Sequence, residues 1–401
     1  MKNVDVLIIG AGPSGSISSA LLRKNGFKIY CVEKEQFPRF VIGESLLPNC
    51  MNYLEEAGFL DAVNRYGFQY KNGASFSWGD EYRYFDFCDK STPGYGTTFQ
   101  VIRSEFDKLL IDEAIKQGVE VSFNTEAKNI DFHKDFVLTT LSNGEVVKSK
   151  FIVDASGYSR VLPTLLGLEV KSHLSEKKAY FTHITDNITE PLYDRNKILI
   201  TTHPEYRGVW FWLIPFSNGR CSIGVVGEDK YIKIENLNEL ETLKSHVYKA
   251  PLLNRLLKNA IWDTPVRYIQ GYSKNVSQLY GDRFIMLGNA TEFLDPVFSS
   301  GVTIAMHSAS LASKCLNKIL KDEPCDLEKE YAKPLMMGVN AFRTYVEGWY
   351  NTKFQDIIYN GKNQTIKRNI CSVLAGYAWD ESNPYVSRSD EALNALWEYC
   401  R

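Results

Sequence analysis

Apolar and polar residues near the start of the chain follow the order of a strand, a helix and a second strand. Residues 4–9 form a short, mostly apolar run with the length and β-branched content of a buried parallel strand. A helical pattern with apolar residues at 17, 20, 21 and 22 follows, and Asn25-Gly26 is a good signal for its end. A second apolar strand, residues 28–32, leads directly to Glu33. The pattern therefore predicts a βαβ unit.

In later segments the spacing of apolar residues alternates between the period of a helix and that of a strand. Residues 49–57 and 103–117 have helical patterns, and alternation at Ala74, Phe76 and Trp78 predicts a strand. Segments 120–124, 128–133 and 136–141 predict a small meander, and an apolar strand over 151–153 ends at Asp154. Strand patterns dominate the next hundred residues, at 179–186, 197–203, 209–216 and 221–226. A buried strand over 282–287 and a long helix over 303–319 come next, and residues 325–401 predict helices rich in aromatic side chains.

The turn between the first strand and its helix reads Gly10-Ala11-Gly12-Pro13-Ser14-Gly15. In a G-x-G-x-x-G turn, the first glycine permits the tight turn and the second lets the backbone approach a pyrophosphate. The third allows close helix–strand packing, and the helix N-terminus faces the phosphates. Glu33 suits the hydroxyls of an adenosine ribose and would repel a 2′-phosphate, which argues against NADP. Because both strands, the helix and the acid are present, we favour a dinucleotide site over a chance glycine-rich turn.

Other residues carry weaker signals. Arg39 is a fixed cation near the predicted dinucleotide site, and Glu44-Ser45 has the composition of an ordinary turn and helix cap. Lys71 stands just before a strand, where a lysine is usually a solvated gatekeeper, and the residue pattern alone favours that interpretation. Trp210 and Trp212 are two apart on a strand and so face the same side. They form either an aromatic packing face or one wall of a ligand cavity.

Composition excludes several classes of protein. The 401 residues are 44% hydrophobic and 23% charged, with a net charge of −2, which gives no reason to expect a nucleic acid or an anionic membrane as partner. With no run of 18 apolar residues we expect no transmembrane helix, and because the chain enters a strand at once we expect no signal peptide. The eight cysteines form no C-x-x-C pair, so we interpret them as free thiols in a reducing cytoplasm. No constellation supports a metal site, phosphoryl transfer or a serine triad.

Four motifs stand in the order of one family. Besides the glycine turn, these are Arg103-x-x-x-Asp107, the Gly288-Asn289-Ala290 stretch and the tryptophan strand around residue 210. Over about residues 1–320 the chain resembles the FAD-dependent monooxygenase superfamily with the p-hydroxybenzoate-hydroxylase-like fold. It is most similar to the flavin-dependent halogenases of the phenol and pyrrole branch, and geranylgeranyl reductase-like dehydrogenases are near relatives.

The resemblance implies an α/β (α+β) fold with a Rossmann-like FAD-binding domain around a parallel sheet. We assign residues 1–80, 100–172 and 275–325 to this domain. Residues 81–99 and 173–274 are assigned to an antiparallel-sheet substrate domain, and 326–401 to a C-terminal helical region that serves as a lid or a dimer surface.

The resemblance also implies a set of FAD-binding residues. Asn289 stands where the family's G-D-A motif has an aspartate that binds the ribityl chain, so an anionic acceptor is lost. The residues expected to bind FAD are Gly10, Gly12, Pro13, Ser14, Gly15, Glu33, Lys34, Arg39, Glu44, Ser45, Arg103, Asp154, Gly288, Asn289, Pro296, Ser300, Gly301 and Val302.

Three further stretches resemble halogenase signatures. Trp210-x-Trp212-x-Ile214-Pro215 matches W-x-W-x-I-P, and the segment 293–301 resembles a second signature whose backbone holds chloride beside the flavin, here near Ser300 and Gly301. Lys71 matches the active-site lysine, which overturns the gatekeeper interpretation. Phe298 stands where the tryptophan-specific branch has a glutamate, which argues against free tryptophan and fits rings that are already electron-rich.

The mechanism that the resemblance implies begins with reduced FAD, which reacts with oxygen to give a C4a-hydroperoxide. Chloride or bromide attacks it, forming hypohalous acid, and Lys71 receives this oxidant and passes Cl⁺ to the substrate. The wall formed by Trp210 and Trp212 keeps the substrate from the hydroperoxide. The substrate is a small aromatic molecule or one tethered to a carrier protein. No second glycine motif offers an NAD(P)H domain, so reduction comes from a partner flavin reductase or transient NAD(P)H contact.

Three other functions remain open at this point. A reductase or dehydrogenase of the geranylgeranyl reductase type would need neither a halide nor Lys71. A hydroxylating monooxygenase would need an open path from substrate to flavin. A flavin-carrying binding or electron-transfer subunit would have a closed cavity between the two domains.

Overall fold

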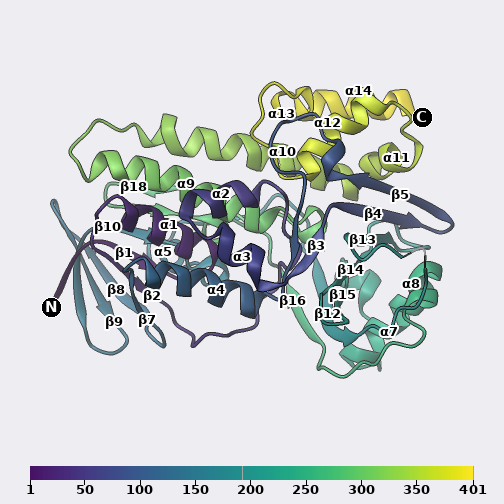
Figure 1. Ribbon diagram of the computed structural model, residues 1–401, viewed down its shortest axis with the longest axis horizontal. Helices are drawn as coiled ribbons and strands as arrows, with labels where there is room; N and C mark the ends of the chain where they lie inside the picture. Colours follow the sequence, from purple (N-terminus) through teal and green to yellow (C-terminus); the bar gives the residue numbers. More distant parts are fainter. Residues whose placement is uncertain (192, 401) are drawn as a thin grey trace.

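A computed structural model describes residues 1–191 and 193–400, which form two large sheets, two small strand pairs and a helical region (Figure 1). The first sheet contains eight strands in the order β18-β19-β10-β1-β2-β7, with the β8–β9 hairpin attached to β10. Its strands are β1 (Lys2–Ile9), β2 (Ile29–Val32), β7 (Glu120–Ser122), β8 (Ala127–Phe132), β9 (Val137–Leu141), β10 (Val146–Asp154), β18 (Tyr280–Gly281) and β19 (Phe284–Met286).

Parallel pairing of β7, β2, β1, β10 and β19 confirms the predicted Rossmann-like sheet. The segment 120–124 was expected in the meander, but its strand β7 pairs in parallel with β2. The antiparallel meander is instead formed by β8, β9 and β10, because β7 follows a helix that returns it to the parallel sheet.

Helices cover the first sheet, and α1 packs against α9 (Figure 1). The sequence around α1 explains its bounds: Pro13 stands at its first position, where a missing N–H loses no bond, and the basic Arg23 and Lys24 occupy its last turn. The helices of this part are α1 (Pro13–Lys24), α2 (Cys50–Ala57), α3 (Leu60–Tyr66), α4 (Arg103–Lys116), α5 (Val161–Leu165) and α9 (Ser300–Ile319).

The second sheet has seven strands in the order β16-β12-β15-β14-β13-β4-β5. All neighbours are antiparallel except β13 and β4, which run parallel. Between β15 and β16 the chain forms three helices, α6 (Asp229–Ile232), α7 (Glu239–Lys249) and α8 (Pro251–Leu256). The strands are β4 (Gly73–Trp78), β5 (Glu81–Asp86), β12 (Lys178–Thr185), β13 (Lys197–Thr202), β14 (Trp210–Pro215), β15 (Arg220–Gly227) and β16 (Arg267–Gln270).

The domain boundary expected at residue 80 falls inside this sheet. β4 and β5 are hydrogen-bonded neighbours in it, so the sheet begins at Gly73 rather than after residue 80. Sequence alternation identified β4 as a strand but carried no information about which sheet it joins. Two small pairs connect the parts: β3 (Gln69–Lys71) with β6 (Thr98–Gln100), and β11 (Glu169–Lys171) with β17 (Lys274–Val276).

The C-terminal region is helical, as predicted, and lies along the top of Figure 1. Its aromatic residues Tyr345, Trp349 and Phe354 are fully buried in the largest hydrophobic core. These side chains therefore tie the region to the rest of the fold instead of being displayed on its surface. The helices are α10 (Lys333–Tyr350), α11 (Lys353–Asn360), α12 (Gln364–Leu374), α13 (Pro384–Ser387) and α14 (Ser389–Cys400).

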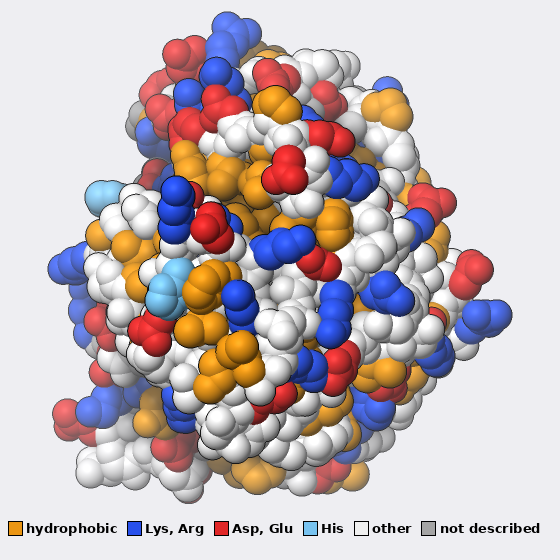
Figure 2. Space-filling model, turned by 90° about the vertical axis from the view of Figure 1, so that its left-hand side faces the viewer, with side chains coloured by type: hydrophobic (Ala, Val, Ile, Leu, Met, Phe, Trp, Pro, Cys, Tyr) orange, Lys and Arg blue, Asp and Glu red, His pale blue; other side chains and the backbone are white. Residues whose placement is uncertain are grey.

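The surface carries a mixture of charges. On the face shown in Figure 2, acidic and basic side chains are interspersed around a group of hydrophobic ones. None of the helices in the described part of the chain has the length and apolarity that a bilayer crossing requires.

Candidate functional site

A cavity of about 1160 Å³ extends from the first turn of α1 to the strands β14 and β16 of the second sheet. Its lining comes from both sheets and from the loops that join them. The sequence-predicted residues that line it are Gly10, Gly12, Pro13, Ser14, Glu33, Lys34, Arg39, Glu44, Ser45, Arg103, Trp212, Asn289, Pro296, Gly301 and Val302.

Glycines shape the end of the cavity at α1. Gly10 has φ +98°, and a Cβ there would lie 2.5 Å from the carbonyl oxygen of Ala155. A Cβ at Gly15 would lie 1.9 Å from the Gly10 carbonyl oxygen, so Gly15 serves packing and does not line the cavity. Gly12 caps α1 without a side-chain hydrogen bond. The first N–H groups of the helix are therefore available to an anion in the cavity.

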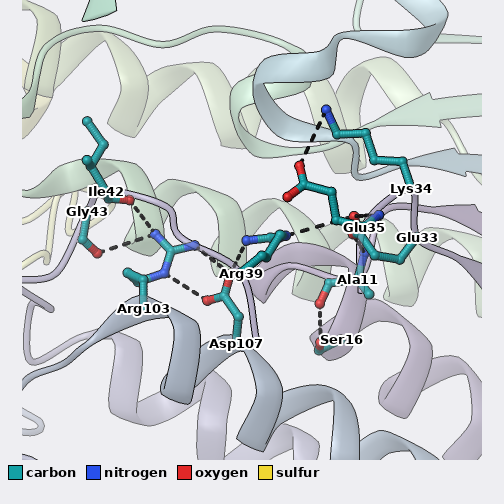
Figure 3. Close-up of polar contacts among 10 residues, drawn as sticks. All are labelled: Ala11, Ser16, Glu33, Lys34, Glu35, Arg39, Ile42, Gly43, Arg103 and Asp107. Carbon is teal, nitrogen blue, oxygen red and sulfur yellow. Dashed lines mark hydrogen bonds and ion pairs between the residues drawn. The ribbon is translucent and has the colours of Figure 1, made fainter. Parts of the chain in front are cut away.

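Glu33 lies at the end of β2 with its carboxylate held by backbone donors (Figure 3). The N–H of Ala11 donates to Oε2 at 2.9 Å, and the N–H of Glu35 donates to Oε1 at 3.1 Å. Lys34 lines the cavity beside it and pairs with Glu35 at 3.7 Å. A carboxylate oxygen can accept two hydrogen bonds, so Glu33 is placed to accept from ribose hydroxyls as well.

Two arginines beside the cavity share one carboxylate, that of Asp107 on α4 (Figure 3). Arg103 donates from Nε and Nη2 to Asp107 at 2.8 and 3.0 Å, and Arg39 donates from Nη1 at 3.1 Å. Arg103 Nη1 also donates to the carbonyl of Ile42 at 2.8 Å, which fixes the loop before Gly43. Asp107 is fully buried, and an unpaired carboxylate there would be strongly destabilising. Resemblance to the family motif singled out Arg103 and Asp107 in the sequence, and the ion pair between them was not predicted.

The far side of the cavity is formed by the start of α9. Ser299 precedes the helix with φ +56°, and it lines the cavity together with Gly301 and Val302. Ser300 is buried but does not line the cavity. The side chain of Asn289 makes no hydrogen bond within the described residues, and it lines the cavity, so its amide is available to a ligand hydroxyl.

Two predicted cofactor residues have other tasks. Asp154 is fully buried and accepts the N–H groups of Ser156 and Leu162 at 2.9 and 2.7 Å. Its carboxylate thus caps the turn after β10 and does not line the cavity. Gly288 also lies outside the lining, and a Cβ there would lie 2.9 Å from the Cβ of Ala305, so it allows close packing on α9.

Lys71 is 0% exposed, which contradicts the interpretation as a solvated gatekeeper. It ends β3, where it lies opposite Thr98 of β6. Its Nζ donates to Ser45 Oγ at 2.8 Å and to the carbonyl of Leu46 at 2.7 Å. Burial lowers the pKa of Lys71 from 10.5 to about 7. Lys71 does not line the cavity itself. Ser45 does line it and is bonded to Lys71, so Ser45 lies between the cavity and the amine.

The two tryptophans face the same side, as predicted, but only Trp212 lines the cavity. Their ring centroids are 6.0 Å apart. The indole N–H of Trp212 donates to Ser222 Oγ, and that of Trp210 donates to Tyr350 Oη, both at 3.0 Å. Trp210 therefore packs beside Trp212 on the same face of β14 and is hydrogen-bonded to the last residue of α10.

Sequence reasoning missed several side chains that line the cavity near Trp212. Phe40 stacks on Phe181 with ring centroids 6.1 Å apart, and the guanidinium of Arg267 lies 3.9 Å from the Phe40 centroid. His183 lies outside the lining, and its Nε2 is 2.6 Å from Oε1 of Glu44, which lines the cavity. Arg267 is in β16, far along the chain from Phe40, and no local pattern marked either residue.

The cavity fits FAD. One end offers free helix N–H groups and the Glu33 carboxylate for an ADP moiety, and the other offers the Asn289 amide and the backbone at the start of α9. The volume exceeds the usual range for small-ligand pockets, about 300–1,000 Å³, as an extended dinucleotide requires.

Comparison with known proteins agrees with this site. The family described as "FAD binding domain" matches residues 3–332. The chain is 31% identical to the tryptophan 2-halogenase of Chondromyces crocatus over 332 residues, covering 80% of this chain and 62% of that protein. It is 30% identical to the 1H-pyrrole-2-carbonyl-[peptidyl-carrier protein] brominase of Pseudoalteromonas luteoviolacea, covering 80% of this chain and 78% of that protein.

Among solved structures, the crystal structure of a flavoprotein/dehydrogenase from Cytophaga hutchinsonii superposes with a TM-score of 0.96. The two sequences are 43% identical, over 100% of this chain and 99% of that chain.

Proposed function

The chain belongs to the FAD binding domain family of flavoproteins, and from that membership we propose that it is a flavin-dependent halogenase of an electron-rich aromatic ring. The protein is an FAD-dependent oxidoreductase. Bound FAD, once reduced, supplies the activation of oxygen that oxidises a halide to hypohalous acid. The remaining chemistry falls to residues of this chain.

The observation that carries the proposal is the environment of Lys71. A neutral lysine amine has two N–H donors and a lone pair, whereas an ammonium has three donors. The two acceptors, Ser45 Oγ and the Leu46 carbonyl, match the neutral form, and none of the carboxylates that the structure describes pairs with the amine. With a pKa of about 7, much of Lys71 is neutral near physiological pH, and its lone pair is available to an electrophilic halogen.

Other residues control access to this amine. Ser45 lines the cavity and contacts Lys71, so we propose that hypohalous acid passes Ser45 on its way from the flavin site to the amine. Trp212 closes the cavity on the side of the second sheet and keeps an organic substrate away from the flavin. Gly301 and the backbone around Ser300, at the start of α9, are assigned to the halide.

The substrate proposed is a phenol or a pyrrole, free or tethered to a carrier protein. Phe298 is buried among the rings of Trp349 and Phe354, at 6.0 and 5.4 Å between centroids. No carboxylate at this position assists a weakly reactive ring, which favours rings that are already electron-rich. The relative from P. luteoviolacea is named for a carrier-bound pyrrole, which supports the tethered form.

We further propose a separate flavin reductase as the source of reduced FAD and a cytoplasmic location. The cytoplasmic location is supported by eight free cysteines, among them the exposed Cys88.

The proposal is tested by turnover with bromide. Purified protein, FAD, a flavin reductase, NADH and oxygen are incubated with a panel of phenols and pyrroles, and products are analysed by mass spectrometry. We expect a product with the paired bromine isotope pattern. A product heavier by one oxygen would instead identify a hydroxylase. A parallel incubation with an isoprenoid alkene in place of the aromatic panel tests for a reductase, which would give a saturated product.

We predict that Lys71→Ala abolishes bromination and retains FAD, because the amine carries the halogen but does not line the cavity. The matched control is Lys197→Ala. Lys197 is also a mostly buried lysine, and its Nζ bonds Asn72 at 3.0 Å and Asp194 at 2.6 Å. The Lys197→Ala variant should brominate at the wild-type rate per bound FAD. Bromination by Lys71→Ala at that rate would remove Lys71 from the mechanism.

A further inference from the structure

A buried carboxylate lies directly before the turn that forms one side of the flavin site. Asp295 is 3% exposed, and its Oδ1 accepts the N–H of Val297 at 3.0 Å. This bond caps the short helical turn η4 (Pro296–Phe298), which leads to Ser299 and α9. Because Pro296 and Ser299 line the cavity, the position of the Asp295 carboxylate determines the shape of the cavity wall there.

The other oxygen of this carboxylate is held by the C-terminal helical region. Tyr350, the last residue of α10, donates its hydroxyl hydrogen to Asp295 Oδ2 at 2.8 Å. The same hydroxyl accepts the indole N–H of Trp210 at 3.0 Å. Tyr272, which lines the cavity, also donates to Oδ2, at 3.3 Å. Three segments far apart in the sequence thus meet at one carboxylate.

Nearby charges act on the same group. Lys177 Nζ lies 4.3 Å from the centroid of the Tyr350 ring and pairs with Glu228 at 3.7 Å. Burial raises the pKa of Asp295 from 3.8 to about 6, and the hydrogen bond from Tyr350 opposes that rise. The titratable or charged groups that face Asp295 are Tyr158, Lys177, Tyr272 and Tyr350.

We propose that Tyr350 is a positioning residue for the flavin site: its hydroxyl holds the Asp295 carboxylate that shapes the 296–299 turn, so the C-terminal region completes the pocket. The proposal goes beyond halogenation and rests only on FAD binding. It also gives the C-terminal region a task other than that of a lid or a dimer surface.

The test measures FAD release from the full-length holoenzyme. The protein is diluted in steps at pH values from 5 to 8, and released FAD is followed by its fluorescence. For the wild type we expect FAD binding to weaken as pH falls through about 6, because protonation of Asp295 removes the anion that organises the turn.

Tyr350→Phe should weaken FAD binding at pH 7.5 by roughly ten-fold, the effect of losing a hydrogen bond to a charged group. Loss of that donor also raises the pKa of Asp295, so the pH midpoint of FAD binding should move upward. A variant damaged only in packing would not move the midpoint.

Tyr345→Phe is the matched control, because Tyr345 is fully buried on the same helix and its hydroxyl faces the carbonyl of Tyr385 at 3.4 Å. It should keep wild-type FAD affinity. Asp295→Asn should bind FAD weakly without a pH midpoint near 6. Equal affinities of the two phenylalanine variants, or an unmoved midpoint in Tyr350→Phe, would overturn the proposal. If Tyr350→Phe does not fold, a persistent midpoint near 6 in Asp295→Asn overturns it.

Discussion

At the scale of single residues, the position of Lys71 has an energetic consequence. The amine of Lys71 is fully buried without a carboxylate partner among residues 1–191 and 193–400, and burial disfavours its charged form. The unfolded chain holds the proton up to the usual pKa of 10.5, whereas the folded chain releases it near 7. Lys71 therefore opposes folding most strongly at acidic and neutral pH.

We predict a pH dependence of stability that Lys71 controls. Between pH 7 and 10 the unfolded state binds more protons at this site, so the free energy of unfolding should rise with pH. The contribution is at most about 1.4 kcal/mol per pH unit. Urea unfolding of the FAD-bound wild type and of Lys71→Met from pH 7 to 9.5 measures it. The rise should be smaller in Lys71→Met, and parallel curves would contradict the burial of a titrating amine.

At the scale of elements, the register between β14 and β15 sets the orientation of Trp212. Trp212 lies opposite Gly224, and a Cβ at Gly224 would lie 2.3 Å from Cζ2 of the indole. The absent side chain leaves the space in which the indole lies flat across β15. The missing side chain at Gly224 thus sets the orientation of the Trp212 indole in the cavity wall.

We predict that Gly224→Ala destabilises the protein by about 1–3 kcal/mol, as overpacked cores do. The displaced indole should also change the tryptophan fluorescence. The control is Gly208→Ala, where a Cβ meets no atom within 4 Å and φ is not positive. Its effect should stay within about 0.5 kcal/mol. Similar unfolding midpoints for the two variants would show that the indole is not confined by Gly224.

Sequence patterns predicted the elements better than the contacts between them. The glycine turn, the strand alternation and the α9 helix are local features, so residues such as Gly10 and Gly12 were found where expected. The contacts of Lys71 are with distant residues, since Ser45 is 26 positions away and Thr98 lies opposite it in β6, and no local pattern encodes that. The Asp295–Tyr350 bond spans 55 residues and was missed for the same reason.

At the scale of the whole molecule, the cavity joins the two sheets. Its lining includes Gly12 at the end of the first sheet and Trp212, Arg267 and Tyr268 in the second. A ligand that fills this space contacts both halves of the protein, so its binding energy adds to the stability of both.

We predict that FAD protects both sheets against unfolding. At a free concentration one hundred times its dissociation constant, FAD should add about 2.7 kcal/mol to the free energy of unfolding. Hydrogen exchange measured with and without FAD should slow in β14 and β16 as well as in β1 and α1. Protection confined to β1 and α1 would contradict a site shared by the two sheets.

The order of the strands along the chain has a consequence for how the protein is made. The chain passes from β2 in the first sheet to β4 and β5 in the second, back to β7–β10, out again to β12–β16, and returns to β18 and β19. Neither sheet is complete until late in synthesis, because β16 and β19 lie beyond residue 266. Such a high contact order slows folding and leaves strand edges unpaired in the meantime. Neither half is therefore expected to fold when expressed alone, and the glycine turn, although synthesised among the first residues, gains its complete binding site only after Tyr350 has left the ribosome.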